Sequence, residues 1–161
     1  MEAIFRKQLE QTLIEEEGVS DTPYFDSLGF VTYGVGHNLD ANPLTHAQRQ
    51  MGISWKFNHK FAMVLLAMDI EQLEQSISDA FNWVLDLPPH QRLALYLMAF
   101  QMGVKRMRDF EPTWKHLRAG ELELVKQHLS TSLWAKQTPE RAKRVINLMT
   151  MKVEDEKPTN A

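Results

Sequence analysis

A short glycine-rich segment near the N-terminus is the feature that most limits the folds open to this chain. Residues 23–37 are rich in aromatic and β-branched side chains and are punctuated by Gly29, Gly34 and Gly36, a composition typical of a β-hairpin. The turn of this hairpin is expected at residues 26–29. Helical patterns occupy the chain on both sides of the segment, so the sequence predicts an α+β fold with one small β-bearing region.

Apolar residues recur at helical spacing through most of the remaining chain. Residues 2–16 form an amphipathic pattern that Gly18 is expected to end. Residues 57–81 form a longer pattern without glycine or proline, and residues 93–100 are apolar on all sides, which is typical of a buried central helix. Further helical patterns are expected over residues 42–51, 112–119 and 121–131, and from Thr138 onward, with Thr138 as the cap and Pro139 as the first helical residue.

The composition excludes several classes of protein. The chain of 161 residues is 43% hydrophobic and 24% charged, which suits one compact globular domain. It contains no cysteine, so disulfides, thiolate nucleophiles and cysteine-based metal sites are excluded. Its net charge of -3 argues against a nucleic-acid partner, and its apolar stretches are too short to span a membrane. The N-terminus has no apolar secretory core, so synthesis in the cytoplasm is expected.

Three consecutive carboxylates stand at the expected C-terminal end of the first helix. Glu15, Glu16 and Glu17 repel one another there and face the negative end of the helix dipole, so stability alone would not select them. Crowded carboxyl groups hold protons more tightly, which is how a general acid is prepared near neutral pH. A solvated acidic helix end is the alternative that this pattern leaves open.

The hairpin supplies two further candidate groups. Asp26 lies at the turn, nine positions after Glu17, and Thr32 follows six positions later. Two carboxylates and a hydroxyl could therefore converge on one cleft. Taken singly, Asp26 also fits an ordinary turn residue and Thr32 an ordinary strand residue.

Three separated blocks of the sequence resemble one known family in the family's own order. The first consists of Glu17 and Gly18, YFDSLG at residues 24–29 and VTYGVGH at residues 31–37; the second is FQMG at residues 100–103; the third is LWAKQTPERAKRVI at residues 133–146. Together they resemble the phage-type lysozymes, and the T-even phage lysozymes in particular. The resemblance runs from about residue 4 to residue 148 and is loose over residues 54–92.

The resemblance implies a lysozyme-like fold with two lobes that face each other across a cleft. A small hairpin-bearing N-terminal lobe is expected at about residues 14–58 and a long joining helix at about residues 59–81. A larger helical lobe is expected at about residues 82–152, packed against the helix of residues 2–13. Residues 153–161 are expected to form a flexible tail.

The resemblance also implies a glycoside hydrolase. Its substrate would be bacterial peptidoglycan, cleaved at the β-1,4 bond between N-acetylmuramic acid and N-acetylglucosamine. Glu17 would be the general acid, while Asp26 and Thr32 would position and activate the attacking water. Such a reaction inverts the anomeric centre, for which the two carboxyl groups should lie roughly 6.5–9.5 Å apart. It requires no cofactor.

Two ion pairs are implied in the same way. Arg141 would pair with Glu17, although a surface residue of a basic helix is the alternative for a single arginine. His37 would form a structural pair with Asp69 across the base of the cleft. The six histidines of the chain have no metal-ligand spacing, so no metal site is expected.

The resemblance places Phe100 and Gln101 on the wall of the cleft, where an aromatic edge and an amide suit sugar rings and N-acetyl groups. Simple core packing is the alternative for Phe100. The chain departs from the family in being slightly acidic where many phage endolysins are basic. It also carries His128 where some relatives have a substrate-binding asparagine.

The expected partner is peptidoglycan, bound by a monomer. A phage holin, which is a pore-forming protein, would release the enzyme from the host cytoplasm to the cell wall in the periplasm. A tail-associated role in the virion is the alternative to this route. The rival functions are a catalytically silent glycan-binding or structural phage protein on the same fold and a helical interaction module. The three retained catalytic residue types argue against the first rival, and the glycine-rich hairpin argues against the second.

Overall fold

The computed structural model describes residues 1–153, and within them it confirms the α+β prediction. The α-helices are α1 (Ala3–Glu17), α2 (His46–Trp55), α3 (His59–Ala80), α4 (Pro89–Met102), α5 (Val104–Met107), α6 (Glu111–Arg118), α7 (Leu122–Ser130), α8 (Leu133–Gln137) and α9 (Pro139–Thr150). Short 3-10 helices are η1 (Asn82–Asp86) and η2 (Arg108–Phe110). The strands are β1 (Ser20–Phe25), β2 (Val31–Gly34) and β3 (His37–Asn38). Of the tail expected at residues 153–161, residues 154–161 lie outside the described residues.

The predicted hairpin is the centre of a small antiparallel sheet in the order β1-β2-β3. Tyr24 pairs with Thr32 across β1 and β2, and the turn between the strands begins at Asp26, as expected. The sequence did not reveal β3, which has two residues and pairs with β2 through Tyr33 and His37. This strand places His37 beside the hairpin rather than in a loop beyond it.

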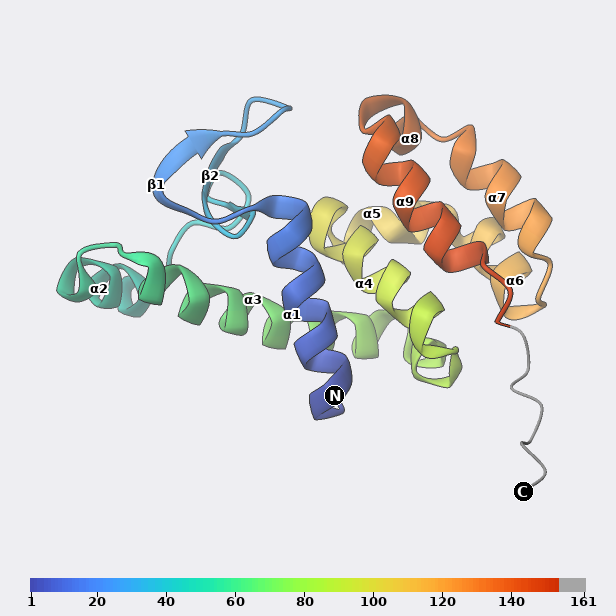
Figure 1. The fold of residues 1–161 in the computed structure, drawn as a ribbon, viewed down its shortest axis with the longest axis horizontal. Helices are drawn as coiled ribbons and strands as arrows, with labels where there is room; N and C mark the ends of the chain where they lie inside the picture. Colours follow the sequence, from blue (N-terminus) through green and yellow to red (C-terminus); the bar gives the residue numbers. More distant parts are fainter. Residues whose placement is uncertain (154–161) are drawn as a thin grey trace, which may run out of the picture.

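The side chains form two hydrophobic cores, and α3 contributes to both. A small core under the sheet contains Tyr33 together with Phe61 and Leu65 of α3. Farther along the same helix, Ile70 and Ile77 pack into the larger core of the helical lobe. Figure 1 shows α3 extending from beneath the hairpin to the region of α4 and α5. One continuous helix thus joins two separately packed regions, which leaves room for a cleft between them.

The first helix packs with the helical lobe although it precedes the hairpin in the chain. Phe5, Leu9 and Leu13 of α1 belong to the larger core. Arg92 of α4 donates to both carboxyl oxygens of Glu2, at 3.3 and 2.8 Å, and its guanidinium lies 4.3 Å from the centre of the Phe5 ring. These contacts fix the start of α1 on α4, so the end of α1 is held at the boundary between the two regions.

The central helix is buried as its all-round apolar pattern predicts. Residues 91–99 of α4 are all buried. The helices α5 and α8 were not predicted, because four and five residues are too few to display a helical period. Among the described residues, no helix combines the length and apolar character that crossing a membrane requires.

Candidate active site

One cavity of about 960 Å³ lies between the hairpin and the helical lobe. Its lining includes residues from β1, β2, α3, α4 and α9, as well as the end of α1. All eight residues singled out from the sequence line it: Glu17, Asp26, Thr32, His37, Asp69, Phe100, Gln101 and Arg141. The fold therefore brings together groups that lie up to 124 positions apart in the chain (141 − 17 = 124).

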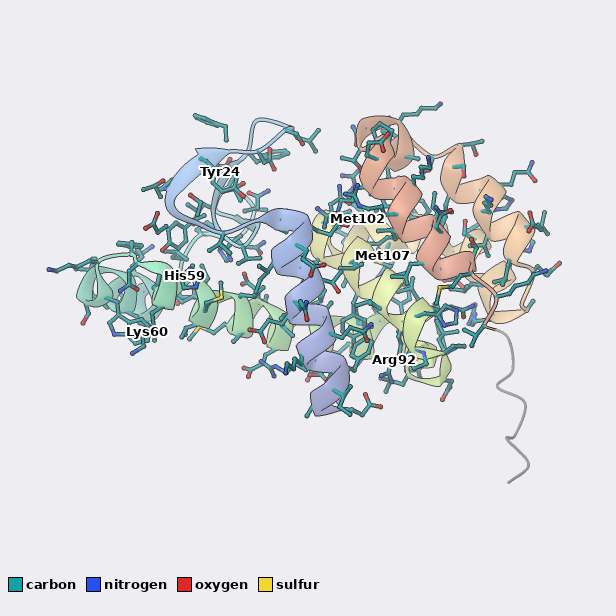
Figure 2. All side chains as sticks on the ribbon, viewed as in Figure 1. Tyr24, His59, Lys60, Arg92, Met102 and Met107 are labelled. Carbon is teal, nitrogen blue, oxygen red and sulfur yellow. The ribbon has the colours of Figure 1, made fainter. Side chains whose placement is uncertain are left out.

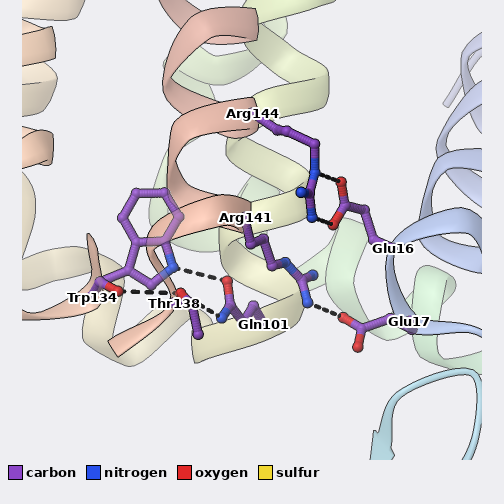
Figure 3. A network of polar contacts seen from close by, with 7 residues as sticks. All are labelled: Glu16, Glu17, Gln101, Trp134, Thr138, Arg141 and Arg144. Carbon is purple, nitrogen blue, oxygen red and sulfur yellow. Dashed lines mark hydrogen bonds and ion pairs between the residues drawn. The ribbon is translucent and has the colours of Figure 1, made fainter. Parts of the chain in front are cut away.

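Glu17 is the last residue of α1, and its side chain meets α9. The helix stops there because Gly18 adopts φ 69° while its N–H still donates to the carbonyl of Ile14. Arg141 of α9 places Nη1 2.6 Å from Oε1 of Glu17, and the two side chains are only 13% and 17% exposed. Figure 3 shows this ion pair crossing from α9 to the end of α1.

A second ion pair lies beside the first. Arg144 donates through Nε and Nη2 to the two carboxyl oxygens of Glu16, at 2.8 and 2.7 Å (Figure 3). These hydrogen bonds, with a smaller contribution from the charges of Arg144 and Arg141, hold the pKa of Glu16 below its ordinary value despite partial burial. Two arginines of α9 thus offset two charges of the acidic triplet, while Glu15 is exposed.

Gly36 packs directly against the carboxyl group of Glu17. A Cβ built on Gly36 would lie 2.8 Å from Cδ and 2.9 Å from Oε2 of Glu17. The residue also adopts φ +63°, which side chains disfavour. The Glu17 carboxyl group is therefore confined between Gly36 and Arg141.

The turn of the hairpin holds Asp26 by one of its two oxygens. Oδ1 accepts hydrogen bonds from the backbone N–H groups of Leu28 and Phe30, both at 2.9 Å. Among the described residues, no protein group is hydrogen-bonded to Oδ2. The interpretation of Asp26 as an ordinary turn residue thus explains the contacts of Oδ1. Its other oxygen, Oδ2, is available to a ligand in the cavity.

Thr32 lies on β2 and is 3% exposed. Its hydroxyl donates to the carbonyl of Phe30 at 3.1 Å, so the hydroxyl proton is already used. The lone pairs of Oγ1 remain to accept a hydrogen bond, since Thr32 lines the cavity.

Tyr24 lines the same cavity as the two candidate carboxylates. Burial raises the pKa of its phenol above the ordinary value, and the charges of Glu17 and Asp26 raise it further. Tyr24 also pairs with Thr32 across the strands, so all four residues belong to one side-chain environment. Figure 2 shows Tyr24 in the β-bearing lobe.

His37 bridges the sheet and α3 at the base of the cavity. Its Nδ1 lies 2.8 Å from Oδ2 of Asp69, and its Nε2 lies 2.8 Å from the backbone carbonyl of Asn42. Burial opposes charge on this ring, but the hydrogen bond to Asp69, the Asp69 charge and the Asn42 carbonyl together raise the pKa of His37. The Asn42 carbonyl only accepts, so Nε2 donates to it, and the Asp69 carboxylate favours a second proton on Nδ1.

Gln101 is fixed by its neighbours on the helical wall. Its Oε1 accepts from Nε1 of Trp134 at 2.8 Å, and its Nε2 donates to Oγ1 of Thr138 at 3.2 Å (Figure 3). The expected capping role of Thr138 is wrong in one respect, because its side chain caps no N–H of α9 and instead joins this network. Beside Gln101, Phe100 is partly buried and lines the cavity, although it also packs against the larger core.

Several lining residues were missed by the sequence analysis. Phe25, Leu28 and Phe30 make the hairpin side of the cavity apolar and are 76%, 48% and 44% exposed. Large apolar residues at a turn were the available signal. Arg106 lines the cavity from α5, where a short basic run was the signal. In residues 1–153 no group of three or more histidine, aspartate and glutamate side chains is arranged to hold a metal ion.

The comparison with known families agrees with the resemblance carried by the motifs. The sequence model of phage lysozyme matches residues 14–152, which contain all eight lining residues named above. The chain belongs to the phage lysozyme family. At the level of that family it is a muramidase-like peptidoglycan hydrolase.

Three curated relatives are similar to this chain over most of its length. The probable T4-type lysozyme 2 of Dictyostelium discoideum is 28% identical over 87% of this chain and 92% of that protein. The probable T4-type lysozyme 1 of the same organism is 25% identical over 83% of this chain and 88% of its own length. The pre-baseplate central spike protein Gp5 of Enterobacteria phage T4 is 26% identical over 86% of this chain, which corresponds to 27% of the spike protein.

Proposed function

We propose that this member of the phage lysozyme family cleaves the β-1,4 bond between N-acetylmuramic acid and N-acetylglucosamine and inverts the anomeric carbon. The proposal rests on the convergence of Glu17, Asp26 and Thr32 on one cavity of about 960 Å³. A cavity of this size falls within the range of ordinary ligand sites, which is roughly 300–1,000 Å³. Its lining combines fixed polar groups with apolar side chains, as a site for sugar rings requires.

Glu17 acts as the general acid in this proposal. Cleavage of an acetal requires a proton on the leaving oxygen, and a protonated Glu17 supplies it. As the C1–O4 bond breaks, its electron pair stays on the leaving oxygen, which takes the proton and leaves Glu17 charged. Arg141, 2.6 Å away, then stabilises the new carboxylate. Arg141 and Gly36 together keep the carboxyl group in one position.

Asp26 and Thr32 activate the water from the hairpin side of the cavity. A water that donates one hydrogen to Oδ2 of Asp26 and the other to Oγ1 of Thr32 presents a lone pair to C1 of the muramic acid. As the new C1–O bond forms, Asp26 takes the proton of that water. Exchange with solvent then removes the proton from Asp26 and returns one to Glu17. Attack on the face opposite the leaving group converts the β bond into an α product.

The rival is a silent glycan-binding protein on the same fold. It would keep the cavity and the ion pairs but cleave nothing. The positions of Asp26 and Thr32 favour hydrolysis, because both leave an acceptor atom in the cavity that can take a hydrogen bond from a water.

Digestion of purified peptidoglycan tests the proposal. The new reducing ends are reduced with borohydride and identified, and the anomer first released is followed by proton NMR. We expect reduced muramic acid ends and the α-anomer. Reduced glucosamine ends would contradict the proposed bond, and an initial β-anomer would contradict inversion. Binding of peptidoglycan by the folded protein without any new reducing end would establish the silent alternative.

A further inference from the structure

A group of exposed cations beside the cavity has no part in the catalytic scheme. Lys105, Arg106 and Arg108 lie within four successive residues, on α5 and the start of η2, and all three are exposed. None of them takes part in the ion pairs formed among residues 1–153. We call these three residues the α5 basic cluster.

The cluster is continuous with the cavity that contains Glu17 and Asp26. Arg106 lines that cavity, while Lys105 and Arg108 line a neighbouring hollow of about 580 Å³. The two cavities share Ser76 of α3 and Val104 of α5 as lining residues. The two hollows are therefore adjacent, with Ser76 and Val104 at their common border.

The backbone that carries the cluster is anchored. Met107 is 1% exposed and belongs to the larger core, and Val104 packs against that core. Figure 2 labels Met107 and Met102, which lie at the end of α5 and just before its start, near the middle of the molecule. The cationic side chains thus extend from a fixed segment rather than from a free terminus.

Three unpaired cations in one short segment repel one another, and the chain as a whole carries a net charge of -3. Charges of one sign gathered beside a cleft attract a ligand of the opposite sign and raise its local concentration. The other arginines that line the main cavity, Arg141 and Arg144, are already paired with Glu17 and Glu16. The α5 basic cluster is therefore the part of the cleft with free positive charge among the described residues.

We propose that the α5 basic cluster binds the carboxylates of the stem peptide attached to muramic acid, an inference that rests on the proposed function. A glycan strand in the main cavity carries peptides that leave the strand sideways, and these peptides have free carboxylates. Arginine binds a carboxylate through two parallel hydrogen bonds, and lysine attracts it as a point charge. Asp79 in the smaller hollow, held by Gln75 at 2.8 Å, offers an opposite charge to the amino group of a diamino acid in the same peptide.

Binding of a free peptide tests this inference without any hydrolysis. The probe is the tetrapeptide L-Ala-γ-D-Glu-meso-diaminopimelate-D-Ala, titrated calorimetrically into the full chain. The variant carries Lys105→Gln, Arg106→Gln and Arg108→Gln. The control carries Lys115→Gln, Lys126→Gln and Lys143→Gln, which remove the same charge at exposed positions outside both cavities. We expect the variant to weaken binding about tenfold or more, because charge-assisted hydrogen bonds are lost, and the control to leave it within about twofold.

A second measurement separates this inference from the proposed function. A second variant with only Lys105→Gln and Arg108→Gln, which line the smaller hollow and not the catalytic cavity, should have a raised KM on peptide-bearing peptidoglycan. Its KM should be unchanged on glycan stripped of peptides by an amidase, and its kcat should be retained on both substrates. Peptide binding by a chain that hydrolyses nothing would support the cluster and contradict the proposed function. Hydrolysis without peptide binding, or equal weakening by the variant and the control, would overturn the cluster. Tighter binding of inorganic phosphate or teichoic acid than of the peptide at the same residues would also overturn it.

Discussion

Gly36 and Glu17 are in contact across the junction of the sheet and the first helix, and this contact leaves no room for a side chain at position 36. The nearest Glu17 atoms, Cγ and Cδ, would lie 2.8 Å from a Cβ at position 36. Since the atoms in conflict belong to the end of a side chain, a Cβ here displaces the carboxyl group rather than the fold. The position of the proposed acid therefore depends on the absence of a side chain at Gly36.

Replacing Gly36 with alanine should lower kcat much more than it lowers stability. A displacement of about 1 Å at a reacting group can cost about 100-fold in rate, and the positive φ costs about 1–2 kcal/mol in the free energy of unfolding. Gly120→Ala is the matched control, because Gly120 adopts φ +74° with nothing within 4 Å of its Cβ. Equal kcat in the two variants would show that Gly36 matters only for its backbone.

The two arginines of α9 should differ in importance. Arg141→Gln removes the partner of the largely buried Glu17 carboxyl group, which should cost up to about 3 kcal/mol in stability and should lower kcat. Arg144→Gln also leaves a largely buried carboxylate unpaired, since Glu16 is 12% exposed, so it should cost a similar amount of stability. Its kcat should stay close to that of wild type, because Glu16 is not the proposed acid. Urea unfolding and turnover of both variants check this. A larger loss of kcat in Arg144→Gln than in Arg141→Gln would contradict the assignment of Arg141 to the acid.

Thr32 should contribute through its hydroxyl. Thr32→Val keeps the shape of the side chain and removes the group that orients the water, so kcat should fall by about 100-fold. It also leaves the carbonyl of Phe30 without its donor, at a cost of about 1–3 kcal/mol. Thr32→Ser restores the hydroxyl and should recover most of the rate. If serine rescues stability but not kcat, the hydroxyl is structural only.

The contact between His37 and Asp69 should make stability depend on pH. The pKa of His37 is raised in the folded state, so the charged form of the ring stabilises the folded protein. This stabilisation is fully present below the unfolded pKa of about 6.5 and disappears as the pH rises through the folded pKa. Asp69→Asn removes the charged partner and should flatten this dependence. Free energies of unfolding in urea from pH 5 to pH 9 measure both. Parallel profiles of wild type and Asp69→Asn would contradict the predicted role of the pair.

The sequence predicted those helices and strands whose apolar or glycine pattern extends over many residues. Residues 57–81 gave the helix α3 to within two residues at each end, and the glycines of residues 23–37 gave the hairpin. The elements α5, α8 and β3 were missed because two to five residues cannot display a period.

The sequence predicted the site residues that belong to a local motif. It did not predict those that come together only through contacts in the folded chain. Glu17, Asp26 and Thr32 stand within 16 successive positions (32 − 17 + 1 = 16), so their spacing could be read directly. The partner of Glu16 lies 128 positions away, and no local pattern links it to Arg144. The confinement of Glu17 by Gly36 likewise depends on how β2 and β3 turn back toward α1, which only the folded chain reveals.

The turnover of Glu17→Gln and Glu15→Gln on permeabilised Gram-negative cells tests whether Glu17 is the acid of a peptidoglycan hydrolase. Both variants remove one charge at the same end of α1, but Glu15 is exposed and lies outside the cavity lining. We predict that wild type and Glu15→Gln clear the suspension and release reducing ends, and that Glu17→Gln, shown to be folded by its thermal unfolding, loses at least about 100-fold of this activity. Retained turnover in a folded Glu17→Gln, or an intact cell wall with folded wild type, would contradict the account.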